Sequence, residues 1–221
     1  FPINTSGTTG RLVVRDQPAV GKPTRQYELT VTVRRDAMAV GGLFRRSQLV
    51  CIAPRFLLVN TLDCAVYLTQ ESTSAQCALP SGARMPWHWS DCSAPQRLCM
   101  RLRGYEWSGA FALEDAEDLT VRVCKPGSAA AGGALEAGAE LSDFLRVEVR
   151  PGENGTVLAV ISRPDPRYPA YRIDNRLREA VVFSQKGTDA KRWPPREVKP
   201  STSTPATWDE PTLKPQMLQL R

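Results

Sequence analysis

The sequence predicts an all-β protein made of two tandem β-sandwich modules, the second of them incomplete. Three observations support this prediction. Apolar and polar residues alternate along several short segments, as in strands that cover a core with one face. Turn-forming pairs of glycine, proline and asparagine separate these segments, with almost no helical pattern between them. A set of residues in the first half of the chain recurs 115 positions later.

The predicted strands fall into two kinds. Strict alternation marks the segments 27–33, 98–102, 119–123 and 145–149. Continuous apolar runs at 56–59 and 157–161 predict strands that are covered on both sides. The turn signals between them include Pro80-Ser81-Gly82, Pro151-Gly152 and Asn154-Gly155. Strands at this spacing without intervening helices are typical of β-sandwiches.

An Ala- and Gly-rich stretch divides the chain. Within it Gly132, Gly133 and Gly138 each disfavour a helix by about 1 kcal/mol relative to alanine. We therefore predict a first β-module over 1–126, a linker or long loop over 127–143, and a second, truncated β-module over 144–221. The proline-rich stretch 192–207 is expected to be an extended loop.

The internal repeat is the most informative feature of the sequence. PRFLLVNTLDCAVYLTQ in the first half aligns with AYRIDNRLREAVVFSQ in the second, which places Asn60 on Asn175. Further along, Trp89 matches Trp208. The second copy lacks a counterpart of GYEWSGAFALEDAEDLTVRV, so we expect it to be truncated or completed by strands from elsewhere. The first residues, FPINTSGTTG, read as the start of a piece of a longer protein.

Composition excludes several classes of function. The 221 residues carry a net charge of +6, but basic residues are spread among acidic ones, and no nucleic-acid-binding motif is present. The longest apolar run is far shorter than the roughly 20 residues that span a bilayer. The single histidine, His88, excludes metal sites with two or three histidines.

The cysteines indicate a reducing setting. All six precede residue 125 and none forms a CxxC pair, so a zinc site is not expected. We expect reduced cysteines and a cytoplasmic location. An extracellular pair of sandwiches with disulfides is the alternative that the even count and two sequons leave open.

No group of residues predicts catalysis. His88 lies between two tryptophans, which favours aromatic packing. The acidic turn formed by Glu114, Asp115, Glu117 and Asp118 lacks the spacing of a calcium loop. We therefore predict a protein that is not an enzyme and needs no metal or cofactor.

Asn60 and Asn175 each end an apolar run and precede a leucine. In a structural role, such an asparagine adopts a left-handed conformation and caps the turn with its amide. In a functional role, the amide clamps the backbone of an extended ligand. The spacing alone favours the structural role.

Five motifs together resemble one family. PRFLLVN, the pair His88-Trp89, WSGAF at 107–111, YRIDN at 171–175 and WDEP at 208–211 occur in its order. The family is the adaptor-binding domain of the vacuolar-protein-sorting thirteen proteins, also called the SHORT-ROOT-binding region. The resemblance covers nearly the whole chain and is weakest over 1–26 and 127–143.

The resemblance implies a function. The family's domain has six tandem β-modules, each marked by an asparagine that Asn60 and Asn175 match, and the present two would be its last. The parent proteins are rod-like bridges that move lipids between organelles. The domain is expected to bind Pro-x-Pro motifs of adaptor proteins, which would bring the remainder of the same large chain to organelle membranes and contact sites.

The residues expected to bind the peptide are Asn175, Asn60, Tyr171 and Trp208. An asparagine amide suits proline-flanked carbonyls, and Tyr171 or Trp208 would pack against the proline rings. The chain's own Pro164-Asp165-Pro166 is a further candidate ligand, for a neighbouring copy. The alternative function is direct binding of anionic lipids or phosphoinositides through the excess of arginine.

Overall fold

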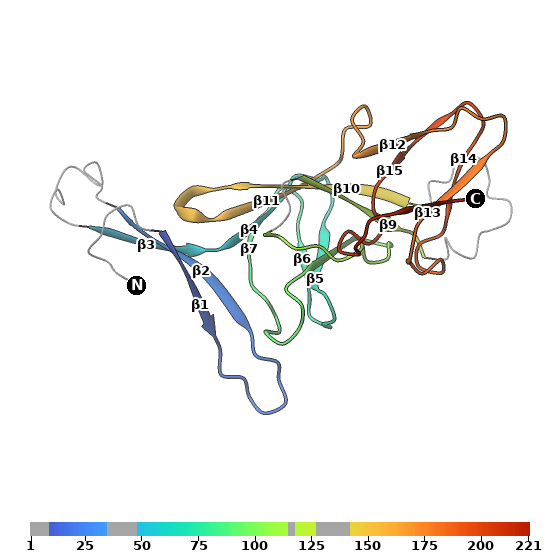
Figure 1. The fold of residues 1–221 in the computed structure, drawn as a ribbon. Helices are drawn as coiled ribbons and strands as arrows, with labels where there is room; N and C mark the ends of the chain where they lie inside the picture. The colour runs from blue at the N-terminus through green and yellow to red at the C-terminus, as the bar shows by residue number, and fades with distance from the viewer. Residues whose placement is uncertain (1–8, 35–47, 115–117, 127–141) are drawn as a thin grey trace.

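The computed structural model describes residues 9–34, 48–114, 118–126 and 142–221 (Figure 1). Strands are the regular elements of these segments, apart from one short 3-10 turn, η1 (Glu153–Gly155). The prediction of an all-β protein is therefore confirmed. In the same segments no helix is long and apolar enough to cross a membrane.

The described strands form five sheets. The first is β1 (Thr9–Arg15), β2 (Gln26–Arg34) and β3 (Leu49–Pro54). The largest has the order β7 (Arg84–Trp87), β4 (Phe56–Asn60), β11 (Val157–Ser162), β10 (Ser142–Pro151) and β9 (Asp118–Cys124). The third has the order β6 (Gln76–Leu79), β5 (Val66–Gln70) and β8 (Leu98–Leu102). The last two are β12 (Tyr171–Asp174) with β15 (Ser203–Ala206), and β14 (Arg196–Val198), β13 (Val181–Gln185) and β16 (Leu218–Leu220).

The sequence repeat recurs in the strand pairing. The pair β4–β7 corresponds to β12–β15, and the sheet β6–β5–β8 corresponds to β14–β13–β16. Each of these two-strand pairs also has a proline at the equivalent position. Pro86 of β7 is paired with Leu57 of β4, and Pro205 of β15 is paired with Arg172 of β12. Because proline has no N–H to donate, Leu57 and Arg172 turn their backbone groups to the other edge of their strands.

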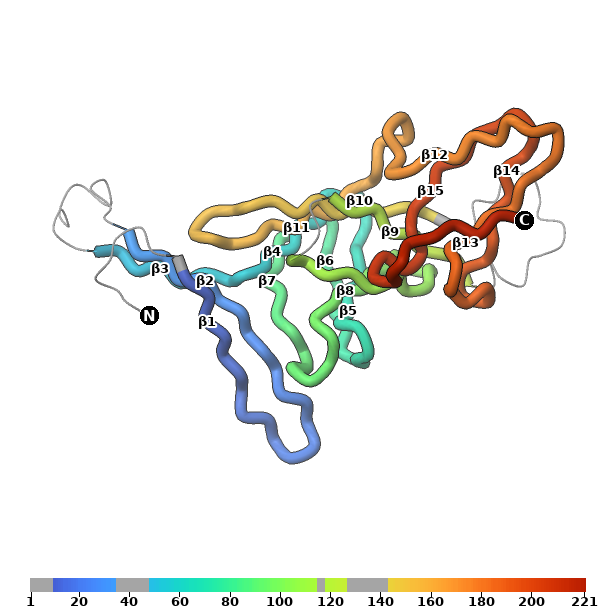
Figure 2. The backbone as a smooth tube through the Cα atoms, viewed as in Figure 1, coloured from blue at the N-terminus to red at the C-terminus, as the bar shows by residue number. Residues whose placement is uncertain are grey.

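A parallel pairing joins the two halves of the chain. β11 lies beside β4 in register from Phe56–Val157 to Asn60–Ile161 (Figure 2). Bonds at both ends of the ladder confirm this register, because Val157 donates its N–H to the Arg55 carbonyl at 2.7 Å and Ile161 accepts from Thr61 at 2.9 Å. Strands β4 and β11 therefore have a paired strand at each edge. The predicted cover on both faces is only partly present, because alternate residues of each strand are buried and the residues between them are half-buried.

The two halves differ in the size of their cores. The larger cluster combines strands from both sides of the predicted linker and includes Phe56, Leu58, Trp89, Val147 and Ile161. The smaller cluster belongs to the second half and consists of Phe183, Val198 and Ala206, with Ile173 packed against it. The strands that follow residue 170 thus have only a small core of their own, and polar contacts also hold them to the first half.

Two predictions concern segments without regular structure. The predicted linker lies outside the described residues, except for Ser142 and Asp143, which begin β10. The stretch 192–207 is not one extended loop, because it contains β14 and β15. Its prolines are compatible with strands since Pro205 occupies a position whose N–H is not needed for pairing.

Candidate functional site

The amide of Asn60 is fully used inside the protein. Its Nδ2 donates to the carbonyls of Cys64 at 2.8 Å, Leu79 at 3.0 Å and Pro80 at 3.0 Å. Its Oδ1 accepts from the N–H of Leu62 at 2.9 Å. The amide therefore fixes the loop that follows β4.

Asn175 makes three equivalent bonds after β12 and lacks a counterpart of the bond to Pro80. Its Nδ2 donates to the carbonyls of Glu179 at 2.8 Å and Val198 at 2.9 Å, and its Oδ1 accepts from the Leu177 N–H at 2.9 Å. Capping of the turn is thus the geometry at both positions. The expected left-handed backbone is wrong, because the described non-glycine residues with positive φ are Ser72, Asn154 and Ser201.

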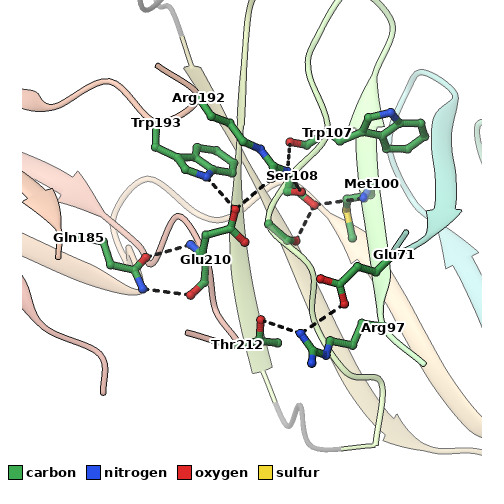
Figure 3. Close-up of polar contacts among 11 residues, drawn as sticks. Glu71, Arg97, Met100, Trp107, Ser108, Gln185, Arg192, Trp193, Glu210 and Thr212 are labelled. Carbon is green, nitrogen blue, oxygen red and sulfur yellow. Dashed lines mark hydrogen bonds and ion pairs between the residues drawn. The ribbon is translucent and has the colours of Figure 1, made fainter. Parts of the chain in front are cut away.

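Two glutamines make a second pair of equivalent hydrogen bonds in the two halves. In the sequence they are only the last matching residues of the repeat. Gln70 donates to the Asp91 carbonyl at 2.7 Å and accepts from the Asp91 N–H at 3.0 Å. Gln185 makes the same two bonds with Glu210, at 3.0 and 2.9 Å (Figure 3). Each glutamine anchors the segment that follows the repeated tryptophan.

The aromatic residues of the predicted site lie together. The rings of Tyr171 and Trp208 are 5.6 Å apart at 68°, and the indole Nε1 donates to the Tyr171 hydroxyl at 3.2 Å. The equivalent pair of the first half, Phe56 and Trp89, has nearly the same geometry, at 6.0 Å and 71°. Phe56 and Trp89 are 1% and 2% exposed, whereas Tyr171 is 51% exposed. Trp208 is half-buried, so the second copy of the pair is open mainly at Tyr171.

Strand pairing explains this difference. In the first half β11 occupies the outer edge of β4, and Trp89 exchanges two backbone bonds with Gln26 at 2.9 and 3.0 Å. In the second half β15 is the partner of β12 among the described strands, so the opposite edge of β12 is unpaired. The sequence repeat alone does not distinguish the covered copy from the uncovered one.

Two adjoining pockets lie beside the open aromatic pair. One, of about 600 Å³, is lined by Tyr168, Tyr171 and Trp208 together with the outward side chains of β9 and β10. The other, of about 740 Å³, is lined by Phe144, Pro205 and neighbouring residues. Pro164 and Asp165 line both pockets, so part of the chain's own Pro-x-Pro sequence forms a wall of the candidate site.

Two arginines near these pockets form ion pairs with carboxylates. Asp165 is paired with Arg167 at 2.7 Å, and the hydrogen bonds from Arg167 lower the pKa of the Asp165 carboxyl. Arg146 is paired in the same way with Asp118, at 2.8 Å. These arginines are therefore already neutralised by carboxylates.

Contacts with the first half hold Trp208 in place. Its predecessor Thr207 donates its hydroxyl to the Thr120 carbonyl at 2.6 Å. Its successor Asp209 forms an ion pair with Arg122, which lies on β9 with Thr120. Because both flanking residues are tied to β9, the indole has a defined position at the pocket.

A second set of contacts fixes the same segment from the other side (Figure 3). Arg192 donates to the Ser108 carbonyl at 3.1 Å and lies 3.2 Å from a Glu210 carboxylate oxygen. Trp193 donates its indole N–H to the same Glu210 oxygen, Oε1, at 2.8 Å. The bond from Arg192 to Ser108 joins the two halves, and Glu210 holds both Arg192 and Trp193.

His88 packs as an aromatic residue, as predicted. Its ring is 4.9 Å from that of Tyr27, and burial lowers the pKa of its imidazole. Among the described residues no group of three or more potential ligands is placed to hold a metal ion.

Comparison with known proteins agrees with this architecture. The model of the adaptor-binding domain of vacuolar-sorting associated protein 13 matches residues 11–215. The chain belongs to the VPS13 adaptor-binding domain family. The resemblance inferred from the five motifs is thereby confirmed, and this family is a non-catalytic, adaptor-binding module.

Similar proteins are intermembrane lipid transfer proteins. Human VPS13D is 28% identical over 206 residues, which are 88% of this chain and 4% of that protein. VPS13 of Chaetomium thermophilum is 22% identical over 78% of this chain and 5% of its own length. Dictyostelium discoideum vps13B is 23% identical over 77% of this chain and 3% of its own length. The chain thus spans a small part of each relative.

Proposed function

We propose that this chain binds extended Pro-x-Pro segments of adaptor proteins, and that the binding site is the open edge of β12 beside Tyr171 and Trp208. The observation that carries the proposal is the open position of Tyr171 beside Trp208: Tyr171 is 51% exposed, whereas its counterpart Phe56 is 1% exposed on a strand with which β11 pairs. A half-exposed tyrosine next to an unpaired strand offers both apolar area and backbone hydrogen bonds to an extended chain.

The edge of β12 has the chemistry for an added strand. In the first half β11 bonds to the Arg55 carbonyl and the Thr61 N–H. The equivalent groups are the Ala170 carbonyl and the Arg176 N–H, which have no hydrogen-bond partner within the described part of the chain. An extended ligand would satisfy them.

The spacing of two prolines suits such an edge. Along an added strand, alternate residues turn their N–H groups toward the protein and away from it. Two prolines separated by one residue can both take positions whose N–H points away, so neither removes a ladder bond. Their preference for extended backbone also reduces the entropy lost on binding.

In this proposal the asparagines act indirectly. Asn175 holds the loop that begins with Arg176, and so keeps the Arg176 N–H at the edge of β12. Asn60 performs the same task at an edge that β11 already occupies. Tyr171 and Trp208 are the side chains that we expect to contact the ligand.

Adaptor binding would bring the protein to a particular organelle membrane. A lipid-transfer protein of this family would reach an organelle membrane through its adaptor, on the cytoplasmic side and at contact sites, while the remainder of the long chain carries the lipid. Affinity near micromolar, about −8 kcal/mol, would allow reversible recruitment.

Fluorescence anisotropy with a labelled Val-Pro-Ala-Pro-Ile peptide tests the proposal. We expect saturable binding that is lost in Trp208→Ala and Tyr171→Ala and is retained in Tyr67→Ala, a matched change on β5. A Val-Ala-Ala-Ala-Ile peptide should bind less tightly. Peptide binding that ignores Tyr171 and Trp208 would contradict the location of the site. Sedimentation with anionic vesicles that disappears in high salt, without peptide binding, would favour the lipid-binding alternative.

A further inference from the structure

The loop after the repeated asparagine differs in charge between the two halves. In the first half it reads Thr61-Leu62-Asp63-Cys64, with one acidic residue, and in the second Arg176-Leu177-Arg178-Glu179, with two basic residues and one acidic. Leu62 is 4% exposed, but Leu177 is 62% exposed. The loop that is covered by the protein itself is acidic, and the loop that lies beside the open edge is basic.

The segment that covers the first loop is known from the structure. β11 ends beside Asn60, and two residues beyond Ile161 comes Arg163. Arg163 forms an ion pair with Asp143, and the charge of Asp63 makes a smaller favourable contribution at this guanidinium. In the first half, a strand on the outer edge therefore brings a positive charge to an acidic loop.

The second loop should attract a negative charge and not a positive one. Arg178 stands in place of Asp63 and has no ion-pair partner among the described residues. The nearby carboxylate of Asp174 is engaged by Arg172 at 2.9 Å and by the Ser203 hydroxyl. A segment that brought an arginine to this position, as β11 does, would meet like charge.

We propose that the open edge of β12 takes a ligand strand parallel to β12, in the register that β11 keeps on β4, and that Arg178 selects an acidic residue. The acidic residue stands two positions after the ligand residue opposite Asn175, because Arg163 stands two positions after Ile161. This inference rests on the proposed function and adds to it the direction, register and charge of the ligand.

The chain supplies the design of a probe. Residues 157–163 read Val-Leu-Ala-Val-Ile-Ser-Arg. Val157 and Ile161 bond to β4, so Leu158 and Val160 alternate with the bonded positions and tolerate proline. Proline at these two positions and glutamate in place of the arginine give Val-Pro-Ala-Pro-Ile-Ser-Glu. The matched control peptide ends in lysine.

The experiment measures both peptides on the 221-residue chain and on Arg178→Glu by fluorescence anisotropy at low salt. For the unmodified chain we expect the glutamate peptide to bind about fivefold more tightly than the lysine peptide, as for an exposed ion pair exchanged for a like-charge contact. Arg178→Glu should reverse this preference, while Arg103→Glu on the first half should leave it unchanged. The sequence-reversed peptide should bind more weakly than the forward one.

The outcomes separate the two proposals. If both peptides bind equally, with the Trp208 dependence described above, the proposed function stands and the selection by Arg178 is wrong. If the reversed peptide binds as tightly as the forward one, the parallel register is wrong. If no Pro-x-Pro peptide binds at all, the proposed function fails and this inference fails with it.

Discussion

The guanidinium of Arg122 and the carboxylate of Asp209 lie 2.9 Å apart, with side chains that are 3% and 2% exposed. Arg122 is on β9, and Asp209 follows the tryptophan of the candidate site. This buried pair is therefore a main contact between the two halves.

Removal of one partner should destabilise the protein strongly. In Asp209→Ala the guanidinium stays buried without its counter-charge, and we expect the free energy of unfolding to fall by about 3–5 kcal/mol. Urea unfolding measures the change. The double variant Arg122→Met/Asp209→Leu should recover much of the loss. A loss below about 1 kcal/mol in Asp209→Ala would show that the pair does not hold the halves together.

Gly109 allows the two halves to approach closely. A Cβ at this position would clash with the Asp209 backbone carbonyl and lie 2.8 Å from Pro211 Cδ. We expect Gly109→Ala to reduce the free energy of unfolding by about 2–3 kcal/mol, since a backbone contact cannot rotate away. Gly21→Ala is the control, because its Cβ would meet nothing within 4 Å and only the strain of its positive φ opposes it. Equal effects in both variants would contradict close packing at Gly109.

The amide of Asn60 should contribute to stability through its donors. Asn60→Ala leaves buried carbonyls unsatisfied, and we expect a loss of about 2–3 kcal/mol in the free energy of unfolding. Asn60→Asp should be no better, since a carboxylate cannot donate to the Cys64, Leu79 and Pro80 carbonyls. Full stability of the aspartate variant in urea would show that the acceptor alone matters.

His88 should make stability depend on pH. Burial lowers the pKa of its imidazole below the ordinary 6.5, so below about pH 6.5 the unfolded chain binds this proton more readily than the folded one. The free energy of unfolding should therefore decrease as the pH falls from 6.5 towards the folded-state pKa of His88. His88→Phe should flatten this slope. An unchanged slope in that variant would assign the dependence to other groups.

Cys99 should resist alkylation in the folded protein. Burial, followed by the charge of Glu71, raises the pKa of this thiol to about 11, so at pH 8 almost none of it is the reactive thiolate. Iodoacetamide labelling read by mass spectrometry should modify Cys99 only after denaturation. None of the six cysteines, all of which are described, is in a disulfide, so the denatured chain should show six thiols. A lower count would revive the extracellular alternative.

Much of the fold could be predicted from local pattern. Alternation and the spacing of 115 residues indicated the strands and the repeat, because both are properties of short windows. The continuous runs at β4 and β11 correctly indicated strands, but their second faces are half-buried and not fully covered. Their parallel pairing with one another was not predicted, since it joins residues 101 positions apart and no turn links them.

The candidate site was harder to predict than the fold. Tyr171 and Trp208 were expected together, but the repeat aligns them with a buried pair, and exposure depends on whether a further strand is present. Arg122 and Asp209 lie 87 positions apart, and neither stood out among the many charged residues. Asn175 was expected to matter, but the sequence could not decide between a structural role and ligand binding. In the structure its amide bonds to the loop after β12 and to Val198.

The pairing of β11 with β4 also bears on stoichiometry. The repeated segment that ends in Asn60 or Asn175 occurs twice, but β11 already pairs with the outer edge of the first copy, β4. Among the described strands, one of the two equivalent edges is therefore left unpaired, and the proposed binding mode predicts one site rather than two. In an array built by this rule, additional repeats would lengthen the scaffold without adding binding sites.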